Sequence, residues 1–130
     1  MNNEFLQTIN KMRNGEIDME EMLKEIIDRK IEQFVKSCDE IDMMMLEQYR
    51  KIVQEQGIQL PCFLEPLDTK DQVLFVTSLV KGYVKKLFME HELEYTDVEK
   101  ENLKTMFNFI KAVKPEDAWL QACLFSLINE

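Results

Sequence analysis

The sequence predicts an all-α protein: a single compact domain of five or six helices, packed orthogonally or as a bundle. Apolar residues recur with a helical period of about 3.6 along most of the chain. Only three glycines and three prolines occur among 130 residues, which is few for a fold built on tight turns. The hydrophobic share of 45% is enough to bury one core. We therefore expect residues 1–130 to form one domain.

The first two helices are expected at residues 3–13 and 19–37, with a short turn between them. The segment 10–21 has a glycine, an isoleucine and acidic residues where an EF-hand calcium loop has them. However, Met12 occupies a ligand position, and a thioether is a poor ligand for calcium. Gly15 fits the end of one helix and Asp18 the N-cap of the next. We interpret the segment as a helix–helix turn.

A third helix is expected at residues 40–56, ended by Gly57. It contains Met43, Met44 and Met45 in succession. Successive helical residues point about 100° apart, so these three side chains cannot share one core stripe. The sequence predicts that at least one of them lies near the surface, where methionine suits contacts with another molecule. The alternative is that this helix packs between two neighbouring helices and so buries more than one of its faces.

The connection at residues 57–68 contains two of the prolines and is predicted to be irregular. A fourth helix follows at 69–91, with Thr69 and Gln72 as its capping box. Its first half is apolar nearly all round, so we expect it at the centre of the fold. Many of these residues are β-branched, which leaves a strand at 73–80 as the alternative. Gly82 indicates close helix packing or the approach of a ligand.

The last two helices are expected at about 96–113 and 115–129. Thr96 and Glu99 form a predicted capping box, and Pro115 suits a first helical turn. The final helix is apolar around most of its circumference, so it must be buried on all sides. Either it is the central core helix or it packs on a second copy in a homodimer. The candidate self-association residues are Trp119, Leu120, Leu124, Phe125 and Ile128.

Acidic residues outnumber basic ones by 25 to 16, for a net charge of −9. This balance argues against direct binding to DNA or to an anionic membrane. From Glu16 to Glu47 there are eleven acidic and four basic residues, a balance of −7. This region is either a partner surface or a solvated face with i,i+4 ion pairs such as Glu25–Arg29. The candidate partner-binding residues are Glu21, Glu25, Asp28, Glu32, Asp39, Asp42, Met43 and Met44.

Residues for catalysis or metal binding are few in this sequence. The three cysteines are widely spaced, and His91 is the only histidine. We therefore expect no catalytic site, no metal and no cofactor. The pattern fits reduced thiols in a cytoplasmic protein, and no stretch resembles a signal peptide or a transmembrane segment.

These observations predict a non-enzymatic interaction module. We expect a small acidic cytoplasmic regulator or inhibitor of bacterial or phage type: an immunity-like, anti-defence or adaptor protein. Its acidic residues would bind a basic surface of a partner protein and occlude that surface. The alternatives are a helical ligand-sensing domain that encloses an apolar small molecule, and a nucleic-acid mimic.

Overall fold

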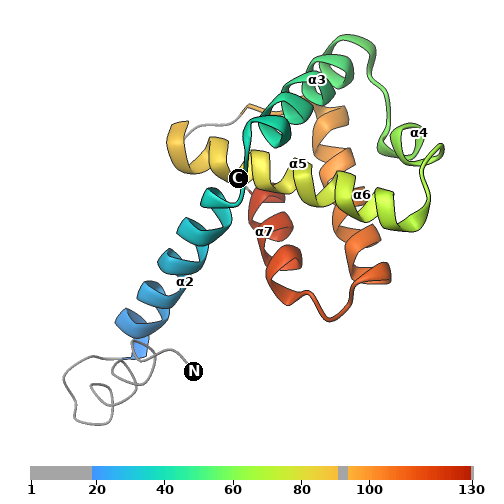
Figure 1. The fold of residues 1–130 in the computed structure, drawn as a ribbon. Helices are drawn as coiled ribbons and strands as arrows, with labels where there is room; N and C mark the ends of the chain where they lie inside the picture. The colour runs from blue at the N-terminus through green and yellow to red at the C-terminus, as the bar shows by residue number, and fades with distance from the viewer. Residues whose placement is uncertain (1–18, 91–93, 130) are drawn as a thin grey trace. The chain divides into compact units, whose positions relative to one another are not determined.

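The computed structural model describes residues 19–90 and 94–129. It confirms the all-α fold class, because these residues form six helices and no strand (Figure 1). The expected helix at 3–13, most of the segment 10–21, and His91 lie outside the described residues. The helices are α2 (Met19–Lys36), α3 (Glu40–Gln56), α4 (Leu60–Leu64), α5 (Thr69–Glu90), α6 (Asp97–Val113) and α7 (Ala118–Ile128).

The chain divides into two compact units, residues 1–36 and residues 37–130. The organisation of residues 1–130 as one domain therefore stays a prediction. In the first unit, α2 begins and ends within one residue of its expected bounds. Glu20 and Glu21 lie in its first turn and Lys36 in its last, where each charge interacts favourably with the helix dipole.

In the second unit, α5 packs against α3 and α7, and α6 packs against α3, α4 and α7 (Figure 1). The central position of α5 is confirmed, because Val76, Leu79, Val80 and Tyr83 are completely buried. Residues 73–80 are helix, as predicted, and not strand. The rest of the core comes mainly from Leu46, Tyr49, Val53, Leu60, Leu103, Met106, Ile110, Leu120, Leu124 and Leu127.

Gly82 marks the closest approach of α3 and α5. A Cβ atom at this position would lie 2.8 Å from Cδ2 and 3.0 Å from Cβ of Leu46. Such distances are too short for a carbon–carbon contact, so the two helices can pack this closely only with glycine here. This confirms close helix packing as the role of Gly82.

Helix α3 has well-formed ends. The backbone N–H of Asp42 donates to Asp39 Oδ1 at 2.9 Å, and the N–H of Asp39 donates to Asp42 Oδ2 at 3.1 Å. This reciprocal pair is a capping box. At the other end, Gly57 takes the left-handed conformation with φ of 64°, and its N–H donates to Val53 O at 2.8 Å. The predicted bounds of 40–56 are confirmed.

Two connections differ from the sequence prediction. Residues 57–68 were expected to be irregular, but they contain the short helix α4 with Pro61 in its first turn, where proline costs no hydrogen bond. The predicted capping box of Thr69 is wrong, because the N–H of Asp71 donates to Asp68 Oδ1 at 2.8 Å. The Gln72 amide instead donates to the carbonyls of residues 64 and 67, which closes the end of α4.

The start of α7 is also corrected. Pro115 was expected in its first turn, but α7 begins at Ala118. Asp117 is the N-cap, and its Oδ1 accepts from the N–H of Leu120 at 3.0 Å. Aspartate is a strongly preferred capping residue, and Asp117 lies two residues after Pro115, so the helix starts three residues later than expected. None of the described helices combines the length and apolar composition needed to cross a lipid bilayer.

Candidate functional site

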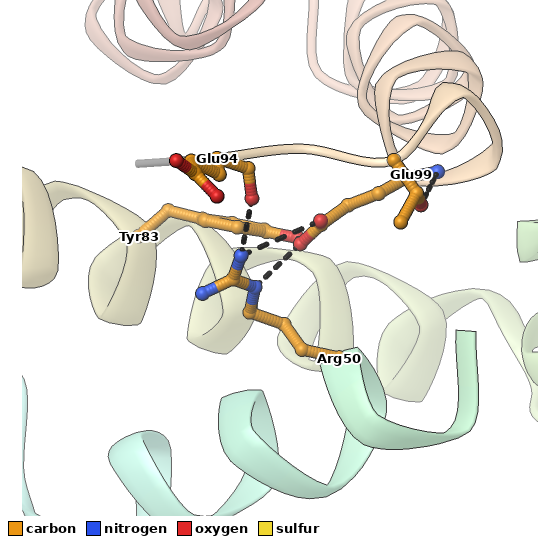
Figure 2. Close-up of polar contacts among 5 residues, drawn as sticks. Arg50, Tyr83, Glu94 and Glu99 are labelled. Atoms are coloured by element: carbon orange, nitrogen blue, oxygen red, sulfur yellow. Dashed lines mark hydrogen bonds and ion pairs between the residues drawn. The ribbon is translucent and has the colours of Figure 1, made fainter. Parts of the chain in front are cut away.

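Arg50 of α3, Tyr83 of α5 and Glu99 of α6 form a buried polar cluster, which we call the Arg50 cluster (Figure 2). Arg50 Nε donates to Glu99 Oε1 at 2.6 Å, and the Tyr83 hydroxyl donates to the same oxygen at 2.5 Å. Arg50 Nη2 also donates to the backbone carbonyl of Glu94 at 2.8 Å. The Arg50 cluster therefore joins three helices and holds the segment that precedes α6.

Burial governs the electrostatics of this cluster. Tyr83 and Glu99 are 0% exposed, and the Arg50 side chain is 14% exposed. Burial raises the pKa of Tyr83 far above its ordinary value, and the negative charge of Glu99 raises it further. Burial alone would lower the pKa of Arg50, but the hydrogen bond and charge of Glu99 outweigh this, so the pKa is raised. The geometry suits a permanent link between helices more than proton exchange with a substrate.

Glu99 corrects the predicted capping box at the start of α6. Thr96 is the N-cap as expected, and its hydroxyl oxygen accepts from the N–H of Glu99 at 3.2 Å. However, the Glu99 side chain does not complete a capping box, because it points into the core toward Arg50 and Tyr83. Sequence analysis missed the Arg50 cluster, since no local spacing connects residues 50, 83 and 99.

Asn102 is a second buried polar residue that organises this unit. Its Oδ1 accepts from the N–H of Leu60 at 2.8 Å, and its Nδ2 donates to Ile58 O at 3.1 Å. The side chain is 1% exposed and lies beside the Tyr49 hydroxyl. Asn102 thereby fixes the chain just before α4 onto α6.

The four predicted partner-binding residues of the acidic stripe all lie on α2. Glu21, Asp28 and Glu32 are exposed, and Glu25 is partly exposed. Glu25 Oε1 lies 2.7 Å from Arg29 Nη2, which confirms the expected i,i+4 ion pair. Such an exposed pair contributes little to stability, about 0.3–0.5 kcal/mol.

The other four predicted partner-binding residues lie at the start of α3 and have different surroundings. Asp39 and Asp42 form the capping box, and Asp42 Oδ1 also accepts from the Ser78 hydroxyl. Met43 is half-buried and lines a cavity of about 220 Å³ next to Arg50. Met44 is 64% exposed, which confirms that one residue of the methionine run lies at the surface.

The outer side of α3 combines apolar and acidic residues. We define the acidic α3 face as Glu40, Ile41, Met44 and Glu47. Ile41 is 68% exposed and Met44 is 64% exposed, so two large apolar side chains face solvent. Glu40 precedes Met44 by one turn and Glu47 follows it by one turn, and both carboxylates are exposed.

An apolar groove lies between α3 and α5, which we call the α3–α5 groove. Its volume is about 360 Å³. Leu74 is 58% exposed on its edge. Sequence analysis missed the groove, because the apolar run around Leu74 was interpreted as buried on every side. The lining residues are Asp42, Met45, Leu67, Asp71, Leu74, Phe75, Thr77, Ser78 and Lys81.

The predicted self-association residues differ in their exposure to solvent. Leu120 and Leu124 are 3% and 0% exposed, so they belong to the protein's own core. Phe125 is 60% exposed, and its ring centroid lies 6.4 Å from that of Phe107 on α6. Trp119 and Ile128 are partly exposed. The helix is therefore not buried all round within this unit, and the homodimer stays a prediction.

No group of three His, Cys, Asp or Glu side chains suited to hold a metal ion occurs in the described part of the chain. No disulfide joins the three cysteines, all of which are described. Cys62 is exposed, whereas Cys38 and Cys123 are buried. Burial raises the pKa of the Cys38 thiol, and the nearby Asp42 carboxylate adds to this, which disfavours the reactive thiolate.

Comparison of the chain with protein-family models, with curated proteins and with solved structures finds no match.

Proposed function

We propose that this protein is a non-enzymatic interaction module that binds a basic surface of a partner protein through the acidic α3 face. The observation that carries the proposal is the exposure of Ile41 and Met44, 68% and 64%, between the carboxylates of Glu40 and Glu47. In this role the protein acts as a small acidic regulator or inhibitor that occludes the surface it covers.

The two kinds of side chain on the acidic α3 face have different roles in binding. Removing Ile41 and Met44 from water supplies affinity, at about 25 cal/mol per Å² of apolar surface buried. Glu40 and Glu47 attract lysine and arginine side chains, which raises the association rate and selects basic partners. The capping box of Asp39 and Asp42 anchors this face, because it fixes the first turn of α3.

The exposed carboxylates of Glu21, Asp28 and Glu32 on α2 form a separate acidic surface in the first unit. Their role in the proposal is secondary, since steering by exposed charges acts on the association rate more than on affinity. Reversal of these charges is therefore expected to slow association and to leave the dissociation rate nearly unchanged.

The test is capture of partner proteins from the native host with the tagged full chain. One variant carries Ile41→Ser and Met44→Ser, and a second carries Glu40→Lys and Glu47→Lys. The matched controls are Val113→Ser, which changes another exposed apolar residue, and Glu116→Lys, which reverses another exposed charge. We expect both α3 variants to lose a partner that the wild type and both controls retain.

Retention of every captured partner by both α3 variants would contradict the proposal. A native mass spectrum of the same preparation examines the alternative of an enclosed apolar ligand, which would appear as a bound mass in all variants alike. Release of the partner by added DNA would instead support nucleic-acid mimicry.

A further inference from the structure

The α3–α5 groove arises from the way its two helices cross. Gly82 and Leu46 bring the helix axes close together at one point. Helices that cross must diverge away from the contact point, and Ser78 and Leu74 lie about one and two turns before it on α5, respectively. The space that opens there is filled only in part by neighbouring side chains.

The floor of the groove is preformed. Phe75 lines the groove, and its ring packs against two other aromatic rings, Tyr49 and Phe63, whose centroids lie 5.0 Å from each other. The ring centroid of Tyr49 lies 6.2 Å away in an edge-to-face arrangement, and that of Phe63 lies 6.1 Å away in a stacked one. An apolar site with a fixed floor loses little conformational entropy when it is occupied.

The edges of the groove are acidic. Asp42 lines it from α3 and Asp71 from α5, against the single ammonium group of Lys81. Hydrogen bonds hold Asp42 in place, from the backbone N–H of Asp39 and from the Ser78 hydroxyl. An occupant with positive charge beside an apolar side chain therefore complements the groove, whereas a second copy of this chain, with a net charge of −9, is repelled.

We propose that the α3–α5 groove receives one large apolar side chain, such as Leu, Met or Phe, from a partner segment that carries Lys or Arg beside it. The inference rests on the proposed function, since it takes the partner to be a protein. The volume of about 360 Å³ lies near the lower end of the range of about 300–1,000 Å³ for ligand sites, which suits a side chain. Ile41 lies one turn before Met45, so the groove adjoins the acidic α3 face.

The test is selection from a display library of random linear peptides with the full chain as bait. Selected peptides are expected to share one large apolar residue next to Lys or Arg. The variant Leu74→Arg should weaken their binding at least about tenfold, because it places a bulky cation at the edge of the groove. The matched control Leu74→Met keeps an apolar side chain of similar size and should bind as the wild type does.

A second readout locates the bound peptide. With methyl-labelled methionine, the NMR signal of Met45 should shift on titration of a selected peptide, while that of the buried Met106 should not. Leu74 is 58% exposed, so Leu74→Arg is expected to fold normally. Selection of acidic peptides, selection of none, or equal binding by Leu74→Arg would overturn the inference.

The same variant separates this inference from the proposed function. If Leu74→Arg retains a cellular partner that the Ile41→Ser/Met44→Ser variant loses, the groove inference fails and the proposed function stands. If neither variant loses a partner, both fail. If both variants lose the same partner, both are supported.

Discussion

The two sides of α3 can be compared directly, because both place charged residues beside large apolar ones. On the inner side, Arg50 pairs with Glu99 and Tyr83, and Leu46 packs against Gly82. On the outer side, the acidic α3 face makes no ion pair with any described residue, and its apolar side chains are about two-thirds exposed.

The difference shows which charges serve the fold. A charge whose partner comes from a distant helix of the same chain contributes to the native structure, and removal of either partner is costly. An exposed charge beside exposed apolar surface contributes little to stability, so another molecule can use it without cost to the fold. Substitutions on the inner side of α3 should therefore cost more stability than substitutions on its outer side.

The largest effect is expected when the Arg50 cluster is broken. Arg50→Met leaves the carboxylate of Glu99, which is 0% exposed, without its cation. We expect the free energy of unfolding to fall by about 3–5 kcal/mol, measured by urea denaturation followed by circular dichroism. Addition of Glu99→Gln to Arg50→Met should recover part of this loss, because it removes the uncompensated charge. A single variant as stable as the wild type would contradict the account.

The helix contact at Gly82 should be the next most sensitive. Gly82→Ala gains up to about 1 kcal/mol in helix propensity. It also places a Cβ atom 2.8 Å from Leu46 Cδ2, so we expect a net loss of about 1–3 kcal/mol in unfolding free energy. In a Leu46→Ala background the same change should cost less or become stabilising. Equal costs in both backgrounds would show that the contact does not limit packing.

The Arg50 cluster also predicts a loss of stability at high pH. In the unfolded chain Tyr83 releases its proton near its ordinary pKa of 10.0, whereas burial and Glu99 raise the pKa in the folded state. Above about pH 10 the unfolded state therefore binds fewer protons, and stability falls by up to about 1.4 kcal/mol per pH unit. This contribution is fully present below pH 10. Tyr83→Phe should reduce the slope in urea titrations at increasing pH, and an unchanged slope would contradict burial of this hydroxyl.

The smallest effect is expected on the outer side. Ile41→Ser with Met44→Ser should change the free energy of unfolding by no more than about 0.5 kcal/mol per site, because both side chains are mostly exposed. Thermal unfolding measures this directly. A loss comparable to that of Arg50→Met would mean that the acidic α3 face supports the fold and is not available for a partner.

The helices themselves followed from the sequence. Apolar periodicity placed α2, α3 and α5, and the glycine after α3 was recognised as its end because only glycine adopts a φ of 64° without strain. Helix α4, within residues 57–68, was not predicted, because it has only five residues and the two prolines favoured a loop. The start of α5 at Thr69 was predicted correctly, but Asp68 and not Thr69 accepts the hydrogen bond from its first turn. The start of α7 was placed too early, because Pro115 also suits a first helical turn.

The candidate surfaces followed only in part. The methionine run indicated correctly that a side chain such as Met44 would be exposed, because three successive helical residues cannot face one core. The burial of Glu99 could not be predicted, since it depends on where Arg50 lies after folding. The exposure of Leu74 likewise depends on how α3 crosses α5, which helical periodicity alone does not determine.

The most direct test of the division between the two sides of α3 is the affinity of a captured partner at increasing salt. The full chain is compared with its Glu40→Lys/Glu47→Lys variant by surface plasmon resonance. We expect wild-type binding to be strong at low salt and to weaken as salt rises. The variant should bind weakly at every salt concentration and unfold at the wild-type denaturant midpoint. Equal affinity and equal salt dependence of the two proteins would contradict this division.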